Sequence, residues 1–347
     1  MRQIAALSHS GCSYVFACPN VPVFRARVSA SVPGVSFVDM PHRSLSFVHI
    51  WTMLKLIHET RGPIVVHSHG RGAGAYSKII CLAARCVVIH TPHGCHFAAG
   101  AHRWFQRLVE GVGILLSGCT LFVSKSEQIE FMGTLKYGAT MVIPNGVAPP
   151  LSSVVADVTR RVDVYFVGRD NWQKDPVLAL FIARQLIQRC GNESRFRFHF
   201  FGEGLDATSD FGRTAIKALG SAVVMHGIVA DVWSWGSPAF ILNTSRWEGM
   251  SLALLEGMVR GAVPVATDVS GNRDVVRRGA NGFLFSRDAP DSAVDWIWEC
   301  VRDQQCYEML RRSAIAQVLQ NHSIERVAAN VEKVYTGLLS LQVGRIM

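Results

Sequence analysis

The stretch that decides the fold is Ser245-Arg-Trp-Glu-Gly-Met-Ser-Leu-Ala-Leu-Leu-Glu-Gly-Met-Val-Arg-Gly-Ala-Val-Pro-Val-Ala-Thr-Asp268. An apolar run at residues 239–242 predicts a strand before it, and a helix is expected to begin near Ser251. Gly261 ends this helix before a second apolar strand at residues 263–266. Two strands joined by one helix form a β-α-β unit, and such units build parallel sheets.

The same alternation of apolar runs and helical stretches continues through the whole chain. Strands are expected at residues 13–18, 35–38, 64–67, 87–90, 121–123 and 141–143, and again at 163–167, 197–201, 223–226, 239–242, 263–266 and 282–285. Helices are expected at residues 45–59, 73–84, 102–116 and 127–135, and from 291 to 339 with a break near 321–323. The predicted fold class is α/β, with two doubly wound domains that face each other across a ligand-binding cleft.

Composition excludes several classes of protein. The 347 residues include 49% hydrophobic and 18% charged side chains, which is typical of a globular chain and not of a disordered one. The nine cysteines form no C-x-x-C pair, so neither a zinc ribbon nor a disulfide framework is expected, and a reducing cytoplasm fits best. We expect no signal peptide and no membrane-spanning helix, so any membrane association would be peripheral.

The positive charge of the chain is unevenly distributed. Residues 1–150 hold 13 Lys and Arg against 5 Asp and Glu, whereas the remainder holds 22 against 21. An anionic partner of the first half is therefore expected: nucleic acid, a membrane surface or a phosphorylated substrate. No helix-turn-helix, RRM or zinc signature accompanies the charge, so nucleic acid is not expected.

The loop and helix start within the quoted stretch predict a binding site. Gly249, Met250 and Ser251 would present backbone N–H groups at a helix N-terminus, where anions bind. Glu248 and Glu256 can both face the cleft and bind hydroxyl pairs of a sugar and a ribose. The alternative, in which Glu248 is a loop charge and Glu256 a solvated helix charge, stays open on spacing alone.

Glu248 and Glu256 stand in the setting S-x-x-E-G-x-x-L-x-L-L-E-x-M-x-x-G-x-x-P-V-A-T-D. This pattern resembles the E-x7-E signature of retaining glycosyltransferase family 4, whose members have the GT-B fold of two Rossmann-like domains. Further segments resemble family motifs from about residue 64 onward. Residues 143–147 resemble the interdomain I-P-N-G-V, residues 167–174 resemble the G-R-x-x-x-x-K loop, and residues 201–204 resemble a G-x-G turn. Residues 224–231 resemble the strand and loop near the nucleotide base, and residues 271–276 and 279–284 resemble the G-x-x-D-V-V and G-x-N-G-x-L motifs that follow.

The resemblance assigns roles to these residues. Arg169 and Lys174 would hold the donor diphosphate, Glu248 a hydroxyl of the donor sugar, and Glu256 the ribose hydroxyls. The remaining donor-binding positions are Gly249, Met250 and Ser251 together with Gly168, Gly202, Gly227 and Ile228. Fixed cations and amides stabilise the negative charge that a leaving diphosphate gains, so neither a metal nor another cofactor is expected.

The first half of the chain contains two segments rich in histidine. Residues 66–74 and 90–97 resemble the H-x-H-x-x-x-A-G and Y-T-x-H-G-F-x-F pair of the polysaccharide-building branch of the family. By that resemblance, His93 would face the donor sugar from the N-terminal domain. A metal site formed by His90, His93 and His96 is the weaker alternative, because this spacing in a loop fixes no ligand geometry.

The resemblance also defines expected domains. These are an N-terminal acceptor domain (1–148), a linker (149–158), a C-terminal donor domain (159–322) and a final helix (323–347) that crosses back to the N-terminal domain. Residues 2–10 resemble the end of the first helix of the family, so the first strand and its glycine-rich loop are expected to be missing. Two smaller departures are Ala148, where Asp is frequent, and Asp175, where Gly is frequent.

The expected function is that of a retaining hexosyltransferase that uses a UDP- or GDP-sugar. Its acceptor would be a saccharide or a lipid-linked molecule, in cell-surface polysaccharide biosynthesis such as that of lipopolysaccharide or exopolysaccharide. The basic first half predicts contact with an anionic membrane surface, at the cytoplasmic face of the plasma membrane. The alternative is a non-catalytic sugar-nucleotide-binding subunit of a glycosyltransferase complex.

Overall fold

The computed structural model describes residues 13–32, 34–41, 45–84, 86–94, 101–132, 138–150, 156, 158–191 and 195–346. The chain forms two compact units, one of Met1–Gly146 with Ile324–Met347 and the other of Val147–Ser323. The expected helix end at residues 2–10, and with it the missing first strand, lies outside the described residues. We call the two units the N-terminal and the C-terminal unit, and each is described by itself.

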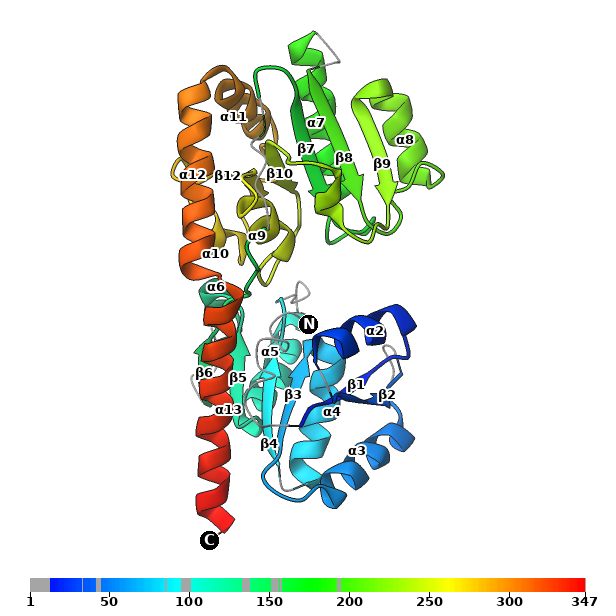
Figure 1. Ribbon diagram of the computed structural model, residues 1–347, viewed down its shortest axis with the longest axis vertical. Helices are drawn as coiled ribbons and strands as arrows, with labels where there is room; N and C mark the ends of the chain where they lie inside the picture. The colour runs from blue at the N-terminus through cyan, green and yellow to red at the C-terminus, as the bar shows by residue number, and fades with distance from the viewer. Residues whose placement is uncertain are drawn as a thin grey trace. The chain divides into compact units, whose positions relative to one another are not determined.

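The C-terminal unit is built on a six-stranded parallel sheet in the order β12-β11-β10-β7-β8-β9 (Figure 1). Its strands are β7 (Val162–Val167), β8 (Phe196–Phe201), β9 (Val223–Gly227), β10 (Phe240–Asn243), β11 (Val263–Thr267) and β12 (Phe283–Phe285). The chain places β8 and β9 outward from β7 and then returns to place β10, β11 and β12 on its other side. The order reverses between β7 and β10, and in doubly wound sheets ligands bind beside the strand ends at this switch point.

Helices cover this sheet because its strands are apolar on both faces. They are α7 (Pro176–Cys190), α8 (Asp210–Leu219), α9 (Leu252–Met258), α10 (Asn272–Val275), α11 (Asp291–Arg302) and α12 (Gln304–Asn321), with short 3-10 turns η1 (Gly220–Ala222) and η2 (Val232–Trp235). One boundary differs from expectation: the helical stretch that begins at residue 291 also breaks at Asp303. The Asp303 carboxylate accepts a hydrogen bond from the Cys306 amide at 2.9 Å and so caps α12.

Among its described residues, the N-terminal unit forms two parallel sheets, β1-β2 and β3-β4-β5-β6. The strands are β1 (Val15–Cys18), β2 (Ser36–Asp39), β3 (Val65–His69), β4 (Val87–Thr91), β5 (Cys119–Phe122) and β6 (Thr140–Val142). The helices are α2 (Pro22–Ser31), α3 (Phe47–Glu59), α4 (Gly70–Ala83), α5 (Ala101–Leu116) and α6 (Lys125–Met132). Parallel strands joined through helices confirm the predicted α/β class in both units.

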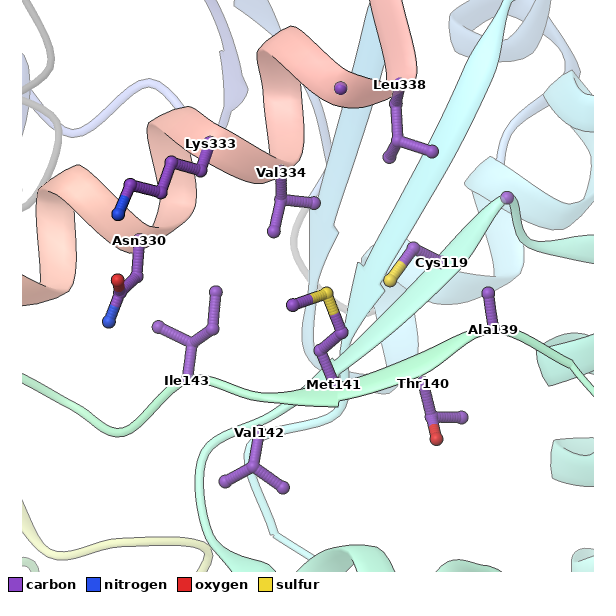
Figure 2. Close-up of a pocket in the computed structure, with 12 residues that line it drawn as sticks. Cys119, Ala139, Thr140, Met141, Val142, Ile143, Asn330, Lys333, Val334 and Leu338 are labelled. Carbon is purple, nitrogen blue, oxygen red and sulfur yellow. The ribbon is translucent and has the colours of Figure 1, made fainter. Parts of the chain in front are cut away.

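The last helix, α13 (Ile324–Ile346), belongs to the N-terminal unit and packs on β3 and β4. Val327 and Val331 of α13 join Ile89 and Leu121 in one buried cluster. Beside this cluster, an open and mainly apolar pocket of about 610 Å³ lies between α13 and the β5–β6 edge, with Lys333 at one end (Figure 2). None of the described helices has the length and apolar character that crossing a membrane requires.

Candidate active site

Two loops meet at the switch point of the C-terminal sheet, one after β7 and one after β10. The amide of Arg246 donates to the carbonyl of Gln173 at 2.8 Å. The Thr244 hydroxyl lies 2.9 Å from the carbonyl oxygen of Lys174 and 2.8 Å from that of Asp175. These bonds fix the backbone of the two loops against each other, so their side chains are held at defined positions.

The central pair of the site is Lys174 and Glu248. The Lys174 ammonium donates to Glu248 Oε1 at 2.5 Å, although the two residues are 74 positions apart. The same oxygen accepts hydrogen bonds from the Ser245 hydroxyl at 2.7 Å and the Asn243 amide at 3.3 Å. Glu248 keeps 8% of its side chain exposed and Lys174 keeps 20%. A buried carboxylate that accepts hydrogen bonds from one cation and two neutral donors is fixed in place.

Sequence reasoning did not identify Asn243 and Ser245 as part of this cluster. Asn243 is the last residue of β10, and Ser245 is the first residue of the S-x-x-E pattern. Polar residues at the end of an apolar parallel strand are the signal that could have found them, because that end lies at the ligand-binding edge of the sheet.

Asp175 follows Lys174 in a left-handed backbone conformation, with φ of 49°. Glycine favours this region, which explains why Gly is frequent at this position in the family pattern and why Asp175 is a departure from it. The Asp175 carboxylate caps α7 through the Leu178 amide and forms ion pairs with Arg246 at 2.8 Å and Arg287 at 2.6 Å. These contacts offset the backbone strain and fix the end of the Lys174 loop.

A hollow of about 190 Å³ lies at the carboxyl ends of β7, β8 and β9. It brings together four predicted donor-binding residues: Gly168, Gly202, Gly227 and Ile228. Gly202 has a φ of 134°, and a Cβ there would lie 1.6 Å from the carbonyl oxygen of Gly168. Only glycine allows the two turns to approach so closely.

Glu256 lies on α9 and is half-buried. Its Oε2 accepts a hydrogen bond from the Trp233 indole N–H at 3.1 Å. The Trp233 ring stacks on Tyr165, with centroids 6.3 Å apart, and the Arg260 guanidinium lies 4.9 Å from its centroid. Trp233 was missed by the sequence analysis, and its only signal is its place just after the predicted base-binding segment 224–231.

The other predicted residues of the C-terminal unit lie around this cluster. Gly249, Met250 and Ser251 are buried, and Ser251 is the residue before α9, where its hydroxyl accepts from the Leu254 amide at 3.4 Å. The helix thus begins at Leu252, directly after Ser251, which confirms the expected start near Ser251. Arg169 is exposed on the loop after β7.

In the N-terminal unit, histidines line up at the ends of β3 and β4. The nitrogen Nδ1 of His69 lies 2.8 Å from Nε2 of His93, and the two rings stack at 5.1 Å. The His67 ring is tilted against that of His69, with centroids 4.1 Å apart, and its Nδ1 lies 2.6 Å from the Tyr335 hydroxyl of α13. His93 itself has a left-handed backbone, with φ of 60°.

Loss of solvent keeps these rings neutral. Burial, together with the neighbouring histidines, lowers the pKa of His67 well below its ordinary value and that of His69 to about 3. Burial also lowers the pKa of His93, although part of the residue stays exposed. A neutral His93 can accept or donate a hydrogen bond at pH 7 without carrying charge.

His90 lies apart from that row. Its Nδ1 bonds to the Ser68 hydroxyl at 2.8 Å, and burial lowers its pKa to about 4. His96, the third residue of the alternative metal site, lies outside the described residues. Within the part of the chain that the structure describes, no three His, Cys, Asp or Glu side chains are grouped to hold a metal ion.

Fold and site together define a protein of two parallel α/β units, with a lysine–carboxylate pair and a glycine-lined hollow at one sheet's switch point. The family described as "Glycosyl transferases group 1" matches residues 161–303, and the family described as "Glycosyltransferase Family 4" matches residues 1–149. The UDP-Gal:alpha-D-GlcNAc-diphosphoundecaprenol alpha-1,3-galactosyltransferase of Escherichia coli is 25% identical over 327 residues, which cover 87% of this chain and 84% of the relative.

Solved structures agree in fold. HepE of Anabaena, crystallised with UDP-glucose, superposes with a TM-score of 0.77 at 15% identity, over 97% of this chain and 96% of HepE. TarM of S. aureus superposes with a TM-score of 0.70 at 16% identity over 84% of this chain, which spans only 58% of TarM. The chain therefore belongs to a glycosyltransferase family with the GT-B fold, and the predicted pair of Rossmann-like domains is confirmed.

Proposed function

We propose that the chain is a retaining hexosyltransferase of family 4. It transfers a sugar from a UDP- or GDP-sugar to a saccharide or lipid-linked acceptor in the synthesis of a cell-surface polysaccharide. The observation that carries the proposal is the pair of Lys174 and Glu248 at the switch point, held at 2.5 Å beside the glycine-lined hollow. A cation and a carboxylate placed together suit a ligand that has both a diphosphate and sugar hydroxyls.

Each side chain has a role in this reaction. Lys174 and Arg169 stabilise the negative charge that grows on the diphosphate as the glycosidic bond breaks. Glu248, fixed by Ser245 and Asn243, orients the donor sugar through a hydroxyl, and Glu256 binds the ribose hydroxyls. The backbone at Gly168, Gly202 and Gly227 and the side chain of Ile228 surround the nucleotide. His93 contributes a neutral imidazole from the N-terminal unit.

The comparisons favour particular substrates. The E. coli relative is named for UDP-galactose and for an acceptor sugar on diphosphoundecaprenol, and HepE was crystallised with UDP-glucose. We therefore propose UDP-hexoses as the first donors to test and a polyprenyl-diphosphate-linked sugar as the first acceptor. An acceptor of this kind is presented at the cytoplasmic face of a membrane, which is where we expect the protein to act.

The test is a transfer assay with labelled UDP-galactose, UDP-glucose, UDP-N-acetylglucosamine and GDP-mannose. Lys174→Met and Glu248→Gln are each expected to lower kcat/KM at least about 100-fold, the loss typical of removing one group that stabilises transition-state charge. The matched controls Lys217→Met and Glu299→Gln change exposed residues of α8 and α11 and should retain activity. NMR of the product identifies its anomer, and an inverted linkage would contradict retention.

The alternative function, a non-catalytic sugar-nucleotide-binding subunit, predicts a different result. The wild-type chain would bind UDP by calorimetry and yet transfer no sugar to any acceptor. In that case Lys174→Met would lower binding without any activity to lose. If the wild-type chain neither binds nucleotide nor transfers sugar, both the proposed function and the alternative are contradicted.

A further inference from the structure

The outer face of α3 exposes large apolar side chains at its start. Phe47 is 89% exposed, Val48 is 72% exposed and Trp51 is 71% exposed, and Leu45 just before the helix is 59% exposed. Phe47 and Trp51 are one helical turn apart, so their side chains lie on the same side of the helix. Phe47, Val48 and Trp51 fall within five positions, so they form a contiguous apolar surface and are not singly exposed apolar residues.

The fold of the N-terminal unit does not require this surface. The opposite face of α3 supplies the buried residues Ile50 and Ile57, which pack with Tyr76 and Ile80 of α4. A helix that already contributes one buried face and is still apolar outside is typical of a helix with a second apolar partner. Thr52 is an exposed polar residue next to the apolar side chains, and further along the outer face Lys55 and Glu59 form an exposed i,i+4 pair.

The charge of the unit indicates what that partner is. The N-terminal unit holds 16 Lys and Arg against 7 Asp and Glu, whereas the C-terminal unit holds 19 of each, so the whole net charge of +9 belongs to the unit that carries α3. Lys55 and Arg61 are exposed at the far end of the helix. Aromatic side chains at the start of a helix within a strongly basic domain fit the interface of an anionic bilayer.

We propose that α3 docks the N-terminal unit on an anionic membrane, with Phe47, Val48 and Trp51 inserted at the boundary between headgroups and acyl chains. The proposal rests on the proposed function in one respect, since a lipid-linked acceptor requires the enzyme to reach a membrane. The surface that makes the contact is the outer face of α3, which is separate from the lysine–carboxylate site of the C-terminal unit.

The experiment is co-sedimentation of the full chain with phosphatidylcholine vesicles that contain or lack phosphatidylglycerol. We expect binding to the anionic vesicles, and a loss of at least about tenfold for Phe47→Ser combined with Trp51→Ser. The matched control is Met309→Ser combined with Leu319→Ser, because these residues are 54% and 46% exposed on α12 of the other unit. Raising salt should weaken binding of the wild type, since the basic residues contribute to it.

A second measurement reports on the helix itself. Trp51 fluorescence, obtained as the difference between the wild type and Trp51→Phe, should be quenched by lipids brominated near the headgroup. Transfer to a short-chain, water-soluble acceptor should be unchanged in the double α3 variant, whereas Lys174→Met should lose transfer and keep vesicle binding. Equal vesicle binding by the wild type and the double α3 variant, or an unquenched Trp51, would overturn the proposal and leave the proposed function intact.

Discussion

Replacing Glu248 by Gln should tighten the binding of UDP while it lowers transfer. The Lys174 ammonium is held by Glu248 at 2.5 Å, so a diphosphate must compete with this carboxylate for the same cation. Gln keeps the shape of Glu, and its carbonyl oxygen can still accept from the Ser245 hydroxyl. The change therefore removes one negative charge and leaves the loop in place.

The size of the effect follows from two contributions of the same sign. Two unit charges about 5 Å apart interact by about 3 kcal/mol at an effective dielectric constant near 20, so the carboxylate repels an incoming phosphate. The ion pair that must be broken is partly exposed at Lys174 and contributes about 1 kcal/mol net. Solvent screening and relaxation reduce the sum, and a net gain of about 1–2 kcal/mol corresponds to UDP binding about 5 to 30 times tighter.

Isothermal titration calorimetry with UDP measures this directly. Lys174→Met should bind UDP more weakly than the wild type, and Glu299→Gln, an exposed carboxylate on α11, should bind it equally well. A Glu248→Gln variant with unchanged or weaker UDP affinity would refute the reasoning, because Lys174 would then not be the group for which carboxylate and diphosphate compete.

Three further predictions concern single contacts. Trp233→Phe keeps the stacked ring but removes the N–H donated to Glu256, so calorimetry should show UDP binding weakened about tenfold and 2′-deoxy-UDP binding weakened less. Gly202→Ala forces a Cβ to within 1.6 Å of a carbonyl oxygen and should cost more than about 3 kcal/mol in urea unfolding, whereas Gly72→Ala, in a helix with no atom near its Cβ, should be neutral or slightly stabilising. Burial lowers the pKa of His90 to about 4, so the unfolded state binds the extra proton between pH 6.5 and 4. Stability should thus be full above pH 6.5 and fall by roughly 3 kcal/mol towards pH 4; His90→Asn should flatten this dependence in urea unfolding at pH 7 and 5, and an unchanged slope would contradict it.

The strands of the C-terminal unit were predictable because their signals are local. An apolar run such as β7, with a glycine directly after it, is typical of a buried parallel strand and its turn. The E-x7-E stretch likewise predicted a strand, a loop and a short helix within one continuous segment. The pairing of β1 with β2 and the order β3-β4-β5-β6 were not predictable, because pairing between strands depends on contacts that no single segment contains.

The site was predictable as residue types and not as contacts. The pairing of Lys174 with Glu248 joins loops 74 positions apart, and only the strand order of the folded sheet brings them together. The bond from Trp233 to Glu256 has the same origin, since it needs α9 to pack beside the turn after β9. Asp175 could be recognised as unusual from its sequence position, but its two arginine partners could not.

The net charge of each unit and the binding of an anionic donor are separate questions. The C-terminal unit has 19 basic and 19 acidic residues and still places Lys174, Arg246 and Arg287 at the end of its sheet, where Glu248 and Asp175 pair with them. Recognition of a diphosphate depends on charges within a few ångströms, and those can be arranged in a neutral domain. A net charge acts instead across a whole face of a domain, within a screening length of about 8 Å at physiological ionic strength, which suits an extended anionic surface. The excess charge of the N-terminal unit therefore bears on the membrane contact that we propose for it and not on the donor.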